Sequence, residues 1–245
     1  MISDAPPKKI RHEAKRKKNL AKIRQRESAK AMDRLEKKNA EASSEIVFIG
    51  RSNVGKSTLL KALTGENVRT GKRPGVTLKP TYIYRDDLLI TDMPGFGFMS
   101  GVTKDKAEDV KTNIVQYIES NKDRIRIAVL VIDGLSFEEI VDRWDERNEI
   151  PIDIELYSFV REIGIIPIIA VNKMDRVDEK DLEPLLDMIA EKYGYAGPRK
   201  ESGIILAPVS ARDKKIRPLV SALKNEIHKM KRDDLFKYLG NPEQK

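Results

Sequence analysis

The feature that most constrains the fold is the octapeptide 50–57, Gly-Arg-Ser-Asn-Val-Gly-Lys-Ser, which fits the pattern G-x-x-x-x-G-K-[ST]. It directly follows the apolar run 46–49 and precedes the apolar pair 59–60. A strand, a glycine-rich turn and a helix are therefore expected in succession, which is the context that this phosphate-binding pattern requires. The alternative, a chance match in a chain of this length, is expected on the order of one time in a hundred.

The chemistry expected of this turn follows from its backbone. Glycines let successive N–H groups surround a β-phosphate, and the positive end of the following helix dipole faces the same group. Lys56 is expected to reach the β- and γ-phosphates and to act in catalysis, and the Ser57 hydroxyl is expected to bind Mg²⁺. The predicted nucleotide contacts in this turn are Gly50, Arg51, Ser52, Asn53, Val54, Gly55, Lys56 and Ser57.

Short apolar runs alternate with helical patterns along the rest of the chain. Such runs are typical of strands that a parallel sheet buries on both faces; they lie at 46–49, 127–132, 165–171 and 204–207. Residues 81–84 and 88–90 predict an antiparallel hairpin at one edge. The fold class expected is α/β: a P-loop NTPase domain whose mostly parallel, doubly wound sheet carries one antiparallel edge strand.

Charge divides the chain near Ser44. Residues 1–44 hold 14 Lys and Arg against 6 Asp and Glu, whereas the remaining residues hold 33 of each. We expect a basic, disordered or transiently helical arm at 1–44, a nucleotide-binding domain at 45–231 and a C-terminal tail at 232–245. The chain has no cysteine, no apolar run of about 18 residues and no apolar stretch behind its basic N-terminus. These features predict a cytoplasmic, soluble protein without a transmembrane helix or a secretory signal.

Two segments between the phosphate loop and residue 96 have the residue types of a magnesium site. Asp92 follows the apolar run 88–90, so it is expected to hold Mg²⁺ through water, while the Gly95 N–H meets the γ-phosphate and acts in catalysis. Thr77 is expected to supply a second hydroxyl to Mg²⁺ and to be catalytic, in a loop that changes with nucleotide state. The predicted contacts are Gly75, Val76, Thr77, Leu78 and Lys79, and Asp92, Met93, Pro94 and Gly95.

A third pattern predicts which base is bound. Asp175 can accept hydrogen bonds from guanine N1–H and from its exocyclic amine, whereas adenine presents an acceptor at N1. Asn172 is expected to bond the base edge and to tie loops together, and the aliphatic stem of Lys173 can cover the purine face. A backbone N–H near Ala211 could meet guanine O6. The predicted contacts are Asn172, Lys173, Met174 and Asp175, and Val209, Ser210 and Ala211.

Taken in order along the chain, these motifs resemble those of the EngB group of translation-factor-class GTPases. The matching stretches read GRSNVGKS, RPGVT, DMPGFGF, NKMD and VSA, and the resemblance extends from about residue 45 to about residue 230. It implies Ser57 and Thr77 as Mg²⁺ ligands and guanine contacts from Asn172, Lys173, Asp175, Ser210 and Ala211. It also implies roles in cell division and septation and in assembly of the large ribosomal subunit.

The chain departs from the bacterial pattern of that group in two segments. The stretch 135–164 is longer and rich in acidic residues, and the basic arm is unusual; both indicate an archaeal-type member. Ser136 and Glu139 resemble a capping box that opens a helix in this stretch. Arg143 and Trp144 lie in a charged helical pattern and are expected on a solvated face.

Phe96 follows Gly95 where many GTPases place a glutamine that orients water, so slow GTP hydrolysis is expected. Asn53 resembles the asparagine that binds K⁺ in related GTPases, and K⁺ beside the β- and γ-phosphates would then partly replace an arginine finger. The alternative for Asn53 is a side chain that stabilises the loop.

The partners expected are a guanine nucleotide and, through the basic arm, rRNA or a ribosomal particle, because Lys and Arg runs neutralise phosphates. The arm could instead be a solubilising tail; a membrane surface is disfavoured because no amphipathic face accompanies the charge. A monomer is expected. The alternative function is an RNA-binding protein in which GTP or GDP is a structural ligand. A nucleotide kinase is disfavoured, because the segment 172–175 reads a base.

Overall fold

The computed structural model describes residues 42–66, 80–96 and 104–240, with the backbone alone at 104–108 and 200. The strands are β1 (Ser44–Gly50), β2 (Thr81–Arg85), β3 (Leu88–Asp92), β4 (Ile125–Asp133), β5 (Ile166–Asn172) and β6 (Leu206–Pro208). The α-helices are α2 (Lys56–Thr64), α3 (Lys104–Asn121), α4 (Phe137–Asp145), α5 (Ile152–Glu162), α6 (Glu179–Lys192) and α7 (Arg217–Lys229). Three 3₁₀ helices are η1 (Met174–Arg176), η2 (Arg199–Glu201) and η3 (Asp233–Tyr238).

The six strands form one sheet in the order β2-β3-β1-β4-β5-β6. β2 runs antiparallel to β3, and every other neighbouring pair is parallel. The predicted fold class is therefore confirmed, including the antiparallel edge strand. Because the parallel strands all end at the same edge, the loops that follow β1, β3, β4, β5 and β6 meet there.

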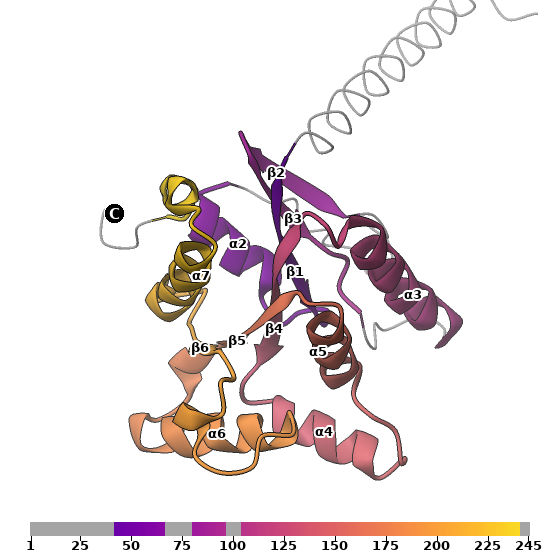
Figure 1. Cartoon of the computed structure of the whole chain (residues 1–245). Helices are drawn as coiled ribbons and strands as arrows, with labels where there is room; N and C mark the ends of the chain where they lie inside the picture. The colour runs from indigo at the N-terminus through magenta and orange to yellow at the C-terminus, as the bar shows by residue number, and fades with distance from the viewer. Residues whose placement is uncertain (1–41, 67–79, 97–103, 241–245) are drawn as a thin grey trace, which may run out of the picture. The chain divides into compact units, whose positions relative to one another are not determined.

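Helices cover both faces of the sheet (Figure 1). α2, α7 and η3 pack on one face, over a core that includes Phe48, Leu60 and Leu223. α3, α4, α5 and α6 pack on the other face, over a core that includes Ile49 and Ile169. Alternate residues of β1 point to opposite cores, as strand geometry requires. In the described part of the chain, no helix combines the length and the apolar character needed to span a bilayer.

Two local predictions differ from the structure. The last strand is shorter than predicted, since β6 holds three residues and begins at Leu206. Ser136 precedes α4, but its side chain makes no capping hydrogen bond and its backbone is already in the α-region, so the predicted capping box is wrong.

Pro167 lies within β5, and β6 pairs with β5 only from Ile169 onwards. A residue without an N–H is tolerated where the strand has a neighbour on one side.

The segment after residue 231, which is predicted to be a tail, packs on the domain through residue 240. Leu235 and Leu239 are buried in the core with α2 and α7. The Gly240 N–H donates to the Leu63 carbonyl at 2.9 Å. A Cβ at position 240 would lie 2.6 Å from that oxygen, so only glycine allows this approach. The C-terminal segment therefore packs with α2 and α7 and satisfies a carbonyl in the last turn of α2.

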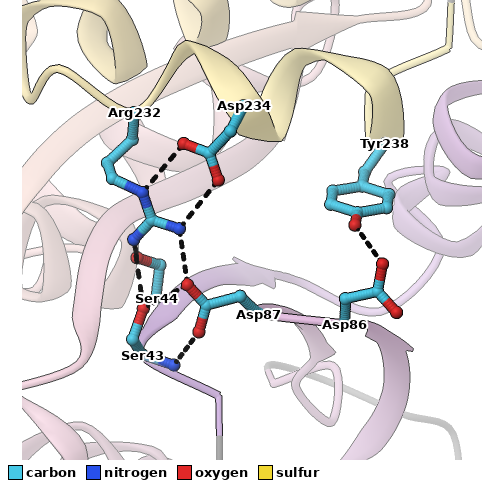
Figure 2. A network of polar contacts seen from close by, with 7 residues as sticks. All are labelled: Ser43, Ser44, Asp86, Asp87, Arg232, Asp234 and Tyr238. Atoms are coloured by element: carbon cyan, nitrogen blue, oxygen red, sulfur yellow. Dashed lines mark hydrogen bonds and ion pairs between the residues drawn. The ribbon is translucent and has the colours of Figure 1, made fainter.

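Arg232 fastens this segment to the start of β1 and to the β2–β3 turn, as Figure 2 shows. Its guanidinium donates to Asp87 at 2.5 Å, to Asp234 at 3.0 Å, and to the hydroxyls of Ser43 and Ser44 at 3.0 Å each. Asp87 also accepts from the Ser43 N–H at 2.9 Å and hydroxyl at 2.7 Å. The two Ser43 bonds and then Arg232 hold the pKa of Asp87 below its usual range.

A lowered pKa in the folded state makes this network sensitive to acid. Its contribution to folding is present above the unfolded-state pKa of about 4 and is lost as pH falls below that value. We predict that Asp87→Asn lowers the free energy of unfolding near neutral pH and that its difference from the wild type shrinks below about pH 4. Urea unfolding at stepped pH measures this, with Asp109→Asn at an exposed position as the control. A difference that stays constant with pH would contradict the prediction.

Candidate functional site

The phosphate loop lies between β1 and α2, as predicted. Gly55 has φ +92°, and a Cβ there would lie 2.3 Å from Nδ2 of Asn172, so glycine is required on both backbone and steric grounds. α2 begins at Lys56, and its first turn contains no acidic residue. The unsatisfied N–H groups of this turn and the helix dipole therefore offer a site for an anion.

Lys56 and Ser57 both contact Asp92, at the end of β3. The Lys56 ammonium donates to Asp92 Oδ1 at 2.5 Å and to the Met93 carbonyl at 2.6 Å. The Ser57 hydroxyl donates to Asp92 Oδ2 at 3.1 Å. Lys56 and Asp92 are each 8% exposed. The ammonium, the hydroxyl and the carboxylate that a phosphate–magnesium site needs are thus within contact of one another.

The segment after Asp92 lies along the phosphate loop. The Ser52 N–H donates to the Phe96 carbonyl at 2.9 Å, and the Phe96 N–H donates to the Gly50 carbonyl at 3.4 Å. Between them, a Cβ on Gly95 would lie 3.0 Å from Ser52 Cα. The Phe96 side chain is 1% exposed and belongs to the core under α3 and α5. Gly95 is therefore beside the phosphate loop, while the Phe96 ring points into the protein.

Arg51 links the phosphate loop to the acidic stretch. Its Nε donates to Asp153 of α5 at 2.5 Å. The guanidinium carbon lies 5.7 Å from the centre of the Phe96 ring and 5.6 Å from that of Trp144. Burial raises the pKa of Asp153, and Arg51 opposes that shift. Trp144 is half-buried in this contact, so its predicted place on a solvated face is wrong; the apolar ring packs on the cation instead.

Asn172, at the end of β5, joins three loops. Its Nδ2 donates to the Val54 carbonyl of the phosphate loop at 2.7 Å. Its Oδ1 accepts the Ala211 N–H of the loop after β6 at 2.9 Å. The side chain is 2% exposed. The structure thus shows the loop-tying contact predicted for Asn172.

Asp175 and Lys173 lie beside this junction. The exposed carboxylate of Asp175 accepts a hydrogen bond from the Ser210 hydroxyl at 2.8 Å, and this bond lowers the pKa of Asp175. Lys173 has φ +68°, and its ammonium donates to Asp133 at 2.5 Å. An ionised acceptor is therefore held in place at the rim of the site, with a long aliphatic stem beside it.

Most predicted site residues meet at one edge of the sheet, at the ends of β1, β3, β5 and β6. Asn53 is exposed with φ +66°. Gly75, Val76, Thr77, Leu78 and Lys79 lie outside the described residues.

Sequence reasoning missed Asp133 and Asp153. Asp133 could have been found, because it follows the apolar run 127–132 as Asp92 follows 88–90; Asp153 is one acidic residue among many and carries no such signal.

The residues present fit a nucleotide-bound Mg²⁺. Ser57 and Asp92 offer a hydroxyl and a carboxylate 3.1 Å apart, and hard oxygen ligands are those that Mg²⁺ prefers. Among the described residues, no group of three or more acidic or histidine side chains forms a cage for a metal.

Known proteins similar to this chain are GTP-binding proteins. The profile of a family described as 50S ribosome-binding GTPase matches residues 45–173. The chain is 58% identical over 195 residues to a probable GTP-binding protein EngB of Methanosarcina mazei, covering 80% of this chain and 93% of that protein. It is 47% identical over 188 residues to a protein of the same name from Pyrococcus abyssi, covering 77% and 86%.

Two solved structures are similar to this chain, one by sequence and fold and the other by fold alone. A crystal structure of a probable GTP-binding protein EngB is 46% identical, with a TM-score of 0.67, and covers 78% of this chain and all of that one. A structure of Era with MgGDPNP and a 16S rRNA segment is 22% identical, with a TM-score of 0.52 over 81% of this chain and 57% of that one, and shows the shared fold. The archaeal relatives confirm the predicted archaeal type. The chain belongs to the EngB family of GTP-binding proteins.

Proposed function

We propose that the chain is a guanine-nucleotide switch that binds GTP and GDP with Mg²⁺ and hydrolyses GTP slowly. The observation that carries this proposal is the Asp175 carboxylate, which accepts a hydrogen bond from Ser210 at the rim of the site. Asn172, in the same segment, ties this rim to the phosphate loop through its bond to Val54. A fixed, ionised acceptor pairs with the two donors on the guanine edge and is repelled by the adenine acceptor. Lys56 neutralises the β- and γ-phosphates.

The buried ring of Phe96 supports slow turnover. It offers no group to polarise water, and it lies in the core at 1% exposure. When bound, Mg²⁺ supplies positive charge to the phosphate oxygens beside Ser57 and Asp92. Lys56, the Gly95 N–H and the Thr77 hydroxyl are the groups of this chain that we assign to stabilising charge on the γ-phosphate.

The base specificity is tested by Asp175→Asn, which replaces one acceptor oxygen with a donor. We predict that GDP binding weakens by about 10²- to 10⁴-fold, because one charge-assisted hydrogen bond is replaced by a contact between two donors and the other loses its charge. We also predict that XDP, whose ring carbonyl accepts from the new amide, binds more tightly to the variant than to the wild type. Calorimetric titration with Mg²⁺ measures both. Asp178→Asn, three residues away and exposed, is the matched control. Unchanged GDP affinity in Asp175→Asn would remove the assignment.

We also propose that K⁺ supports hydrolysis beside Asn53. This residue is exposed in the phosphate loop with φ +66°, so its side chain is free to face a bound nucleotide. The expected result is turnover about 10-fold faster in KCl than in NaCl of equal ionic strength, with the difference abolished in Asn53→Gly. Glycine keeps the left-handed backbone. Equal turnover in the two salts would leave Asn53 as a loop-stabilising residue.

The partner that we propose is a ribosomal particle in the cytoplasm, with roles in ribosome assembly and cell division carried over from the family. The family description and the excess of 14 basic over 6 acidic residues at 1–44 support it. We predict that replacing the four basic residues 15–18 with glutamine makes the plot of log binding constant against log salt concentration less steep. The slope should fall by roughly 0.7 to 0.9 for each charge removed from a phosphate contact.

Co-sedimentation with large ribosomal subunits, in GTP-analogue and GDP states, measures this binding. An unchanged slope would identify the arm as a solubilising tail. Equal binding in both nucleotide states would favour the alternative in which the nucleotide is a structural ligand of an RNA-binding protein.

A further inference from the structure

Asp133 is the last residue of β4 and pairs in register with Asn172 of β5. Its Oδ2 accepts a hydrogen bond from the ammonium of Lys173 at 2.5 Å. The exposed side-chain fractions are 13% for Asp133 and 27% for Lys173. The cation of the base-binding segment is therefore held by a neighbouring strand end and is shielded from solvent on most sides.

The backbones of these two strand ends are also joined. The Gly134 N–H donates to the Asn172 carbonyl at 3.0 Å. A Cβ on Gly134 would lie 2.9 Å from a methyl carbon of Val171 and 3.0 Å from the sulfur of Met174. Close packing thus fixes where the Asp133 carboxylate stands relative to the segment 172–175. Lys173 itself has a left-handed backbone at φ +68°, so its side chain is constrained at both ends.

A purely structural role does not explain why a buried carboxylate stands at position 133. Its Oδ1 is buried and makes no hydrogen bond to any described residue. A buried acceptor without a donor is unfavourable, and a buried ion pair is often no more stabilising than a well-packed apolar pair. A carboxylate at this place therefore suits a role in orienting Lys173 better than a role in stability.

We propose that Asp133 is a positioning residue for guanine-nucleotide binding. By pairing with the ammonium of Lys173, it holds the aliphatic stem of that lysine where the stem covers the face of the purine. The inference rests on the proposed function and adds to it a residue outside the base-reading motif. A free lysine loses its rotamer freedom when a ligand packs on it, whereas a lysine already held in place loses little. Asp133 lowers this cost without touching the nucleotide.

The size of the effect follows from that cost. Immobilising one rotamer-rich side chain is worth about 2- to 10-fold in affinity. Because the same contact serves the ground state and the transition state, its loss raises KM by this factor and leaves kcat unchanged. A residue that only stabilised the fold would lower the fraction of active protein instead, and so the apparent kcat.

The experiment is a double-mutant cycle on GDP affinity, measured calorimetrically with Mg²⁺, over the wild type, Asp133→Asn, Lys173→Met and the double variant. Methionine keeps an unbranched stem and removes the ammonium. The expected result is a loss of about 2- to 10-fold for Asp133→Asn when Lys173 is present and a loss of less than about 2-fold when it is methionine. Asp142→Asn, which removes an exposed pair with Lys192, is the matched control and should bind GDP like the wild type.

Three outcomes would overturn the inference: equal GDP affinity for the wild type and Asp133→Asn, the same loss in both Lys173 backgrounds, or a fall in kcat at constant KM. Urea unfolding without nucleotide identifies a folding defect, and in that case Asp133→Glu, which keeps the carboxylate, should restore GDP affinity at least in part if the inference holds. Wild-type protein that binds no guanine nucleotide would refute the proposed function itself, a result distinct from any of these.

Discussion

The buried amide of Asn172 is the contact on which the whole site depends. It donates to the phosphate loop at Val54 and accepts from the loop after β6 at Ala211. At 2% exposure it has no water to replace either bond, so loss of one partner would leave a buried polar group unsatisfied. The steric limit at Gly55 comes from the same side chain. One residue thus sets the spacing between the phosphate loop, the segment 172–175 and the loop after β6.

Charge pairs arranged around this amide keep the ionisable groups in place. Lys56 is held by Asp92, Arg51 by Asp153 and Lys173 by Asp133, each at 2.5 Å. In each pair the carboxylate comes from a different element than the cation, so the pairs also connect α2 to β3, the phosphate loop to α5, and the segment after β5 to β4. Under the proposed function, the groups assigned to the nucleotide are therefore oriented before it arrives, which lowers the entropy cost of binding. At the other end of these strands, Arg232 bonds the start of β1 and the β2–β3 turn, and η3 packs into the core beside α7.

The sequence predicted the parts of the site whose signal is local. The phosphate loop, Asp92 and Asn172 each follow an apolar run, and a strand end in a parallel sheet is where ligands bind. The partner of Arg51 was not predictable, because Asp153 lies about 100 residues away and nothing in its neighbours distinguishes it from the exposed acids nearby. The sequence predicts a tail after residue 231, because Leu235 and Leu239 are too few to form a periodic pattern, yet tertiary packing buries both.

The capping box at Ser136 is wrong for a different reason. The residue types fit, but the backbone there is already helical and the hydroxyl makes no hydrogen bond to the free N–H groups.

The central claim, that this edge of the sheet binds guanine nucleotides, is tested most directly by titrating the wild-type chain with GDP, GTP and ATP in the presence of Mg²⁺. The account predicts that both guanine nucleotides bind at about micromolar Kd or better and that ATP binds at least roughly 10³-fold more weakly. Equal binding of ATP would contradict it.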